Sequence, residues 1–137
     1  MKKLWTDLHS NIHHNQMEDL DKWVEHARAV LDFWPIAYYP FQMIKSETGA
    51  GLEDLCPKEA IEKDWEQVRE KVKQVNAEGY PMFMGYEWQG CGFDGDHNVF
   101  FLDNNQPMKH PMRYEELKKA YEGTEAIAIP HQVAYQL

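Results

Sequence analysis

The chain has 137 residues and a formal net charge of −9, from 14 Lys and Arg against 23 Asp and Glu. This length suits one domain that spans residues 1–137. A content of 43% hydrophobic and 27% charged residues is typical of a globular protein rather than a disordered one. The acidic balance argues against duplex nucleic acid as a partner, because such affinity depends on Lys and Arg placed at phosphates.

The sequence also argues against a membrane protein or a disulfide-stabilised one. Mean hydropathy is −0.70, and no apolar run approaches the roughly 20 residues that a membrane helix needs. The opening MKKLWTDLHS lacks the apolar core of a signal peptide, so we expect a cytoplasmic protein. The two cysteines, Cys56 and Cys91, have no CxxC spacing and are interpreted as free thiols.

The first third of the chain predicts a strand, a helix and a second strand. Lys3–His9 is expected to be a short strand, followed by a polar loop over Asn11–Gln16. Asn15 and Glu18 match a capping box at the start of a helix. Phe33–Tyr39 is a continuous apolar run, which is typical of a buried parallel strand. The apolar residues with helical spacing between these segments are Met17, Leu20, Trp23, Val24, Ala27, Val30 and Leu31.

The remainder of the chain predicts a long loop, two helices and three strands. Pro40–Cys56 has no clear period and is expected to be a loop without regular structure. Pro57 is placed at the start of a helix that ends at Gly79. The later elements are a strand over 81–88, a strand over 98–102, a helix over 114–121 and a strand over 126–130.

This order, β-α-β-α-β-β-α-β, predicts an α/β fold with a mostly parallel sheet. Active sites of such folds gather at the carboxyl ends of the strands. His9 ends the first predicted strand, Glu87 lies near the end of the third, and His131 follows the last. The glycine-rich turn before His97 allows a hairpin, which would bring His97 beside Glu87. We therefore expect these four side chains to converge on one rim.

Imidazole and carboxylate side chains together suit Zn, Mn or Fe ions. A divalent metal ion held by such groups can activate water for hydrolysis. His13 and His14 lie in the polar loop, and either could be a further ligand. Asp94 and Asp96 are interpreted as turn formers, with metal contact as the alternative. His26 and His110 are interpreted as structural residues.

Four short motifs resemble the PHP (polymerase and histidinol phosphatase) superfamily, especially its uncharacterised PHP-like branch. They are TDLHSNIHH, GYEW, GDHNVF and IAIPHQ. The resemblance implies a distorted (β/α)7 barrel, a site with two or three metal ions, and phosphoester hydrolysis. It assigns His9, Glu87, His97 and His131 as metal ligands.

The sequence departs from the PHP pattern at three points. Asn11 stands where the family has its second histidine, and His13 or His14 would have to replace it. Ala37, Tyr38 and Tyr39 stand where the family has Thr-Asp-His. The final Asp-x-His motif of the family has no counterpart before residue 137.

The residues and the resemblance together predict a metal-dependent phosphoester hydrolase with a small-molecule substrate. Lys45 is a candidate phosphate contact. The alternative is a non-catalytic PHP-like protein that binds a sugar-like or other small ligand. Its binding wall would consist of Trp34, Tyr38, Tyr39 and Trp88. A third reading is a plain structural α/β domain whose histidines have no shared role.

The predicted strands account for little more than half of a seven-stranded barrel, which would ordinarily need about 200 or more residues. We therefore expect an N-terminal part of a longer PHP-like barrel, or a piece that a partner chain completes. If the chain is complete, a smaller open sheet that forms a homo-oligomer is expected instead.

Overall fold

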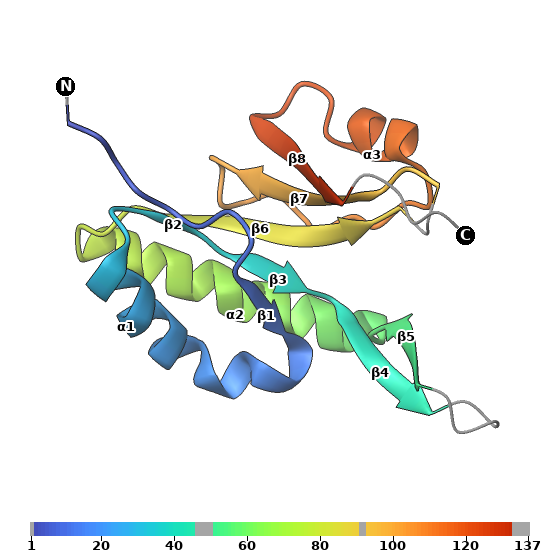
Figure 1. The fold of residues 1–137 in the computed structure, drawn as a ribbon, viewed down its shortest axis with the longest axis horizontal. Helices are drawn as coiled ribbons and strands as arrows, with labels where there is room; N and C mark the ends of the chain where they lie inside the picture. Colours follow the sequence, from blue (N-terminus) through green and yellow to red (C-terminus); the bar gives the residue numbers. More distant parts are fainter. Residues whose placement is uncertain (1, 46–50, 91–92, 133–137) are drawn as a thin grey trace.

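A computed structural model describes residues 2–45, 51–90 and 93–132, without the side chains of 44–45, 51–52 and 131–132. Within these residues the chain forms a mixed α/β fold (Figure 1). The strands are β1 (Asn11–His13), β2 (Trp34–Pro35), β3 (Ala37–Tyr39), β4 (Phe41–Lys45), β5 (Gly51–Leu55), β6 (Met82–Gln89), β7 (Asp96–Phe101) and β8 (Ala126–Gln132). The helices are the 3-10 helix η1 (His14–Asp19), α1 (Leu20–Val30), α2 (Lys58–Ala77) and α3 (Tyr114–Ala120).

The main sheet has the strand order β1-β3-β6-β7-β8, and β2 pairs with β6 beside β3. The pairs β1–β3, β3–β6 and β2–β6 are parallel, whereas β6–β7 and β7–β8 are antiparallel. The α/β class and the predicted hairpin are confirmed. The sheet is mixed rather than mostly parallel, because the hairpin reverses the chain and β8 then reverses it again. The described residues form no closed barrel.

The two faces of the main sheet differ in what packs on them. Tyr38, Tyr86 and Val99 point to the side that carries the helices, where Tyr38 bonds to α2 and Tyr86 bonds to Tyr121 after α3. We call this side the helix face. Because side chains alternate along a strand, Glu87 and its neighbours lie on the opposite side, the Glu87 face. The Glu87 face also holds Asn11, Tyr39, Gly85, Gln89, Asp96, Asn98, Phe100, Ile127 and Ile129.

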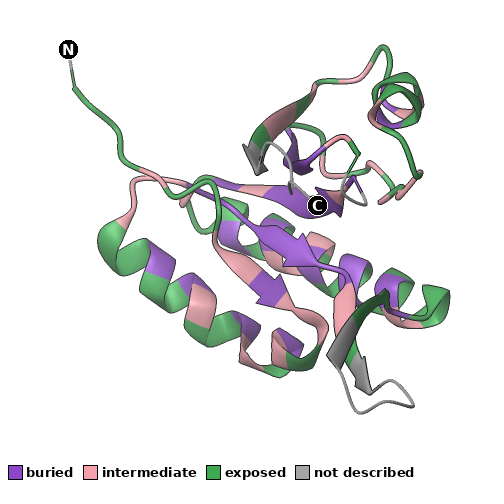
Figure 2. Ribbon diagram, turned by 45° about the vertical axis from the view of Figure 1, so that its right-hand side comes forward, coloured by how far each residue is buried: buried purple, intermediate pink, exposed green. Residues whose placement is uncertain are grey.

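The core lies between the helix face and the helices α1 and α2, which run side by side along it (Figure 1). Buried residues concentrate in β3, β6 and β7 and on the helix surfaces turned toward them (Figure 2). The largest fully buried side chains include Trp34, Tyr38, Tyr86 and Trp88. No described helix is both long enough and apolar enough to cross a membrane.

Helix α2 forms as its sequence predicts. Pro57 is its N-cap, and Gly79 lies just beyond it with a φ of 89°. A positive φ is favourable for glycine, so the chain can turn there toward β6. The apolar stripe of α2 is buried as expected, at Ile61, Trp65, Val68, Val72 and Val75.

Helix α1 begins later than predicted. The chain first makes the 3-10 helix η1, and α1 starts at Leu20. The expected capping box at Asn15 and Glu18 is wrong. Instead, Gln16 reaches back and accepts a hydrogen bond of 3.1 Å from the backbone N–H of His13. The apolar spacing still holds, since Met17, Leu20, Val24 and Ala27 are buried, although Val30 is exposed.

The predicted strand over Lys3–His9 is wrong, because the first strand is Asn11–His13. The earlier residues are extended but join no strand ladder. Their backbone bonds go to single groups, such as Trp5 N–H to the Asp32 carboxylate at 2.9 Å. The expected loop over Pro40–Cys56 is also wrong in part, because β4 and β5 pair as an antiparallel hairpin. The two segments satisfy each other's backbone groups without needing a long apolar pattern.

The apolar run Phe33–Tyr39 is confirmed as parallel and buried, but it divides into β2 and β3. Pro35 lacks a backbone N–H and cannot continue a ladder. The N–H of Ile36 still donates to the carbonyl of Phe83 at 3.0 Å, which keeps the segment against β6.

Candidate functional site

Glu87 is a buried carboxylate near the carboxyl end of β6. It is 4% exposed and lies on the Glu87 face of the sheet. Its Oε2 accepts a hydrogen bond of 2.5 Å from Nδ2 of Asn11, which comes from β1. Nε2 of His9 lies 3.5 Å from the same oxygen. The structure thus brings His9 and Glu87 together, as the sequence predicts.

The surroundings of Glu87 act on its charge in opposite directions. Burial raises the pKa of Glu87, since the charged form loses its hydration. The hydrogen bond from Asn11 and the nearby ring of His9 oppose this increase, whereas the neighbouring carboxyl of Asp96 adds to it. A positive charge placed here would therefore stabilise the ionised carboxylate.

Asn98 lies directly across the β6–β7 pair from Glu87, so the two side chains share a face. Asn98 is 1% exposed, and its Nδ2 donates to the carbonyl of Leu8 at 2.7 Å. Among the described residues, neither its Oδ1 nor the Oδ1 of Asn11 has a hydrogen-bond partner, although both atoms are buried. One of these amide oxygens belongs to β7, which pairs with β6, and the other to β1, which β3 separates from β6.

Asp96 lies two residues before Asn98 on β7 and is also buried on the Glu87 face. Its Oδ1 accepts a hydrogen bond of 3.3 Å from the backbone N–H of Gly90. This bond closes the turn of the β6–β7 hairpin, as expected for a turn-forming aspartate. It also places a second carboxyl near Glu87.

His97 lies on the helix face, opposite Trp88 in the β6–β7 register. Its ring stacks on Tyr114 of α3 at a centroid distance of 4.5 Å and lies 5.7 Å from the ring of Trp88. The structure therefore does not bring its side chain to Glu87. Because side chains alternate along a strand, the sequence of β7 indicates that Asp96 and Asn98 share one face and that His97 lies on the other. It does not indicate which of these two faces is the one that holds Glu87.

His131 lies on β8 between Pro130, which pairs with His97, and Gln132, which pairs with Asp96. Its backbone therefore reaches the same rim as the end of β6. Its side chain lies outside the described residues, as does the side chain of Lys45.

His13 is the last residue of β1 and His14 follows it, and their rings contact different partners. The ring of His13 packs on Tyr39 at a centroid distance of 4.5 Å. His14 instead bonds through Nδ1 to Oδ2 of Asp64 on α2, at 2.6 Å. The same oxygen accepts the hydroxyl of Tyr38 at 2.7 Å. Sequence reasoning did not single out Asp64, a buried acid on the apolar stripe of α2, although a charge at such a position needs a partner.

A second polar group lies at the carboxyl ends of β3 and β6. The Tyr39 hydroxyl donates to Glu53 of β5 at 2.9 Å and accepts from Nε2 of Gln89 at 2.5 Å. Burial is the largest cause that raises the pKa of Tyr39, followed by Glu53, and Glu87 adds to the increase. We call Tyr39, Gln89 and Glu53 the rim cluster.

The expected aromatic wall is only partly in place. Trp34, Tyr38 and Trp88 are at most 1% exposed and belong to the core, so they cannot contact a ligand. Tyr39 alone of these four lies on the Glu87 face. His110 is structural, as predicted, because its Nε2 accepts the backbone N–H of Gln89 at 3.3 Å. Burial lowers the pKa of His110 to about 4.

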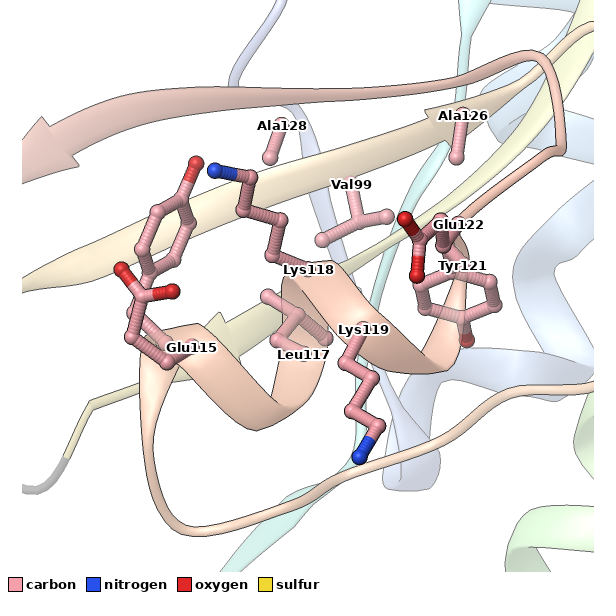
Figure 3. Close-up of a pocket in the computed structure, with 10 residues that line it drawn as sticks. Val99, Glu115, Leu117, Lys118, Lys119, Tyr121, Glu122, Ala126 and Ala128 are labelled. Carbon is pink, nitrogen blue, oxygen red and sulfur yellow. The ribbon is translucent and has the colours of Figure 1, made fainter.

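Two hollows lie on opposite faces of the sheet. A groove of about 590 Å³ lies between α3 and the strands β7 and β8, with Val99, Ala126 and Ala128 on the strand side (Figure 3). Since Val99 is on the helix face, this groove is separated from Glu87 by the sheet. A smaller apolar hollow of about 240 Å³ includes Phe83, Phe100 and Ile129 and lies on the Glu87 face.

No three side chains of His, Cys, Asp and Glu gather into a metal-binding group within the part of the chain that the structure describes. Beside the Glu87 carboxylate and the His9 imidazole lie the side-chain amides of Asn11 and Asn98, and asparagine is not one of these four residue types. No protein-family model, no curated protein and no solved structure matches the chain.

Proposed function

We propose that this chain is a metal-dependent hydrolase, with a PHP-like sheet and a phosphoester as substrate, and that Glu87 and His9 hold its divalent cation. The observation that carries the proposal is the buried carboxylate of Glu87 at the carboxyl end of β6, 3.5 Å from the ring of His9. A carboxylate with a raised pKa in a buried position is typical of functional sites.

The donor chemistry fits a divalent ion. A carboxylate and an imidazole are ligands for Zn, Mn or Fe ions. A cation bound there would supply a coordinated water of lowered pKa and a Lewis acid for a phosphoryl oxygen. The backbone position of His131 at the same rim supports it as a further ligand. The position of His97 on the helix face does not support the role that the resemblance implies for it.

The residues of this chain hold the site in place. Asn11 donates to Oε2 of Glu87 and so fixes the orientation of the carboxylate. The segment before β1 packs over the Glu87 face, where the Leu8 carbonyl accepts a hydrogen bond from Nδ2 of Asn98. The ring of His9 is 53% exposed and remains open to solvent. The site therefore has a buried carboxylate side and an open side that a substrate could reach.

Hydrolysis of an aryl phosphate or phosphodiester by the purified, cation-supplied protein tests the proposal. Glu87→Gln keeps the shape of the side chain and removes its charge. We expect it to lower kcat/KM by about a hundredfold or more, because even partners of metal ligands are worth ten- to a hundredfold. Glu115→Gln, at an exposed position on α3, is the matched control and should leave the rate unchanged. Folded protein that binds the cation but cleaves no phosphoester would refute the assignment.

A non-catalytic ligand-binding protein is the second candidate, and the rim cluster favours it. The Tyr39 hydroxyl, the Gln89 amide and the Glu53 carboxylate form a set of groups suited to sugar-like hydroxyls. The carboxylate would also repel a phosphate group. In that case sugars, but not aryl phosphates, should raise the Tm, and Glu87→Gln should leave this ligand effect intact.

A further inference from the structure

Strand β8 carries its small side chains on the helix face and its large ones on the Glu87 face. Ala126 and Ala128 lie on the helix face, beneath α3. Ile127 and Ile129 lie on the Glu87 face, where Ile127 is 54% exposed. A strand face beneath a helix usually carries the larger apolar side chains, because protein interiors are densely packed. The two alanines instead leave open the groove of about 590 Å³ between α3 and the strands.

Contacts at both ends of α3 hold this groove open. At the start of the helix, the ring of Tyr114 stacks on His97 at a centroid distance of 4.5 Å, and its backbone N–H donates to Asp94 at 2.9 Å. Just after the helix, the hydroxyl of Tyr121 lies 3.1 Å from that of Tyr86. Because these contacts fix α3 to β6, β7 and their connecting turn, the helix cannot settle onto the alanines of β8 without breaking them. A groove that exists before a ligand arrives lowers the entropic cost of binding.

One ammonium group extends over the groove from α3. Figure 3 shows Lys118 reaching toward the strand side, where Ala128 lies, whereas the neighbouring Lys119 points away from the strands. Glu122 lies toward the other end of the groove, where Ala126 is (Figure 3). Among the residues that the structure describes, no carboxylate forms an ion pair with Lys118. An anionic group is therefore the partner that complements this end of the groove.

We propose that this groove binds a monocarboxylate with a short apolar tail, such as a medium-chain fatty acid. The carboxylate pairs with Lys118, and the tail lies along Ala128 and Leu117. A volume of about 590 Å³ is within the range of small-molecule sites, roughly 300–1,000 Å³. A second carboxylate at the far end of the ligand would be repelled by Glu122. Since the sheet separates this groove from Glu87, the inference does not depend on the proposed cation centre.

Three probes of equal chain length that differ only at their ends test the assignment: octanoate, octanol and octanedioate. They are titrated into the whole chain, labelled with ¹³C at the alanine methyl groups and followed by NMR. Octanoate should shift the signals of Ala126 and Ala128 and should bind more tightly than the other two probes. Octanol lacks the charge that pairs with Lys118, and octanedioate brings a second carboxylate to Glu122.

The two adjacent lysines of α3 provide a matched pair of variants. Lys118→Gln should weaken octanoate binding about three- to fivefold, toward the upper end of what an exposed ion pair contributes, and should reduce the preference for octanoate over octanol. Lys119→Gln removes the same charge from the neighbouring position and should bind octanoate as the wild type does. Ala128→Leu fills the groove and should abolish binding, whereas Ile127→Leu changes the opposite face and should leave it unchanged.

The lysine variants keep the proposal testable if Ala128→Leu does not fold. The inference is overturned if octanoate leaves the signals of Ala126 and Ala128 unshifted, or if the two lysine variants bind octanoate equally well. Folded Ala128→Leu that binds octanoate as the wild type does also overturns it. Octanol that binds as tightly as octanoate rules out the carboxylate as the recognised group. Alanine signals that change on dilution without any probe would assign the groove to a second copy of the chain instead.

Discussion

Gly85 is the position where one added methyl group should test the packing beneath Glu87. Gly85 lies two residues before Glu87 on the same face of β6 and pairs with Phe100 across the hairpin. A Cβ built on Gly85 would lie 2.2 Å from Cδ1 of Phe100 and 2.7 Å from the backbone oxygen of Ile36. A phenyl ring can rotate away, but the Ile36 carbonyl belongs to the backbone that links β2 to β3.

The expected cost of Gly85→Ala follows from these two contacts. Overpacking a filled site usually costs about 1–3 kcal/mol, and a backbone clash places this case toward the upper end. The alanine also restricts the unfolded chain, which offsets about 0.4–1 kcal/mol. We therefore expect Gly85→Ala to lower the free energy of unfolding by about 2 kcal/mol, within the range of these two effects.

Gly79→Ala is the matched control, because a Cβ at Gly79 meets nothing within 4 Å and only its φ of 89° opposes the change. That strain alone should cost about 1 kcal/mol. Urea unfolding at equilibrium, with m-values compared, measures both variants. The reasoning is refuted if Gly85→Ala is as stable as the wild type or costs less than Gly79→Ala. In a background of Phe100→Leu the cost at Gly85 should fall only in part, since the Ile36 carbonyl remains.

Two further predictions concern groups outside the Glu87 site. Asp64→Ala should lower the free energy of unfolding by about 2–3 kcal/mol, because it leaves the buried Tyr38 hydroxyl without its acceptor. Tyr38→Phe should lower the free energy of unfolding by less, and equal costs of the two variants in urea unfolding would contradict this. The pKa of His110, about 4 in the folded protein, lies below its ordinary value of 6.5. Between these two pH values the unfolded chain binds more protons than the folded one, so the free energy of unfolding should fall as the pH drops from 6.5 to 4. His110→Gln should flatten this part of the pH profile of Tm, and a profile unchanged from the wild type would show that another group is responsible.

Much of the fold is readable from periodicity. The helical spacing from Ile61 to Val75 is the stripe that α2 buries, and Gly79 ends the turn that follows it. The hairpin of β6 and β7 follows from two apolar strands around a glycine-rich turn. These features are local, because a repeat of 3.6 or 2 residues and a turn residue act over a few neighbouring positions.

The pairing of β4 with β5 and the length of β1 are not readable in the same way. Both are short segments whose backbone groups are satisfied by a partner rather than by their own pattern. The extended segment before β1 has strand-like composition, yet its bonds go to Asp32 and to the carbonyl of Phe33. Such choices depend on which backbone groups are left over once the longer elements have packed.

The candidate site also has one part that the sequence predicts and one part that only strand pairing decides. That Glu87 must have a function or a partner can be inferred from a charge within an apolar run. The proximity of His9 to Glu87 was expected from a strand that ended at His9, whereas the structure places His9 before β1. The choice between His97 and Asn98 cannot be inferred in this way, because alternation puts them on opposite faces without stating which face is which. Pairing of β7 against β6 sets that phase, and it turns Asn98 toward Glu87 and His97 toward α3.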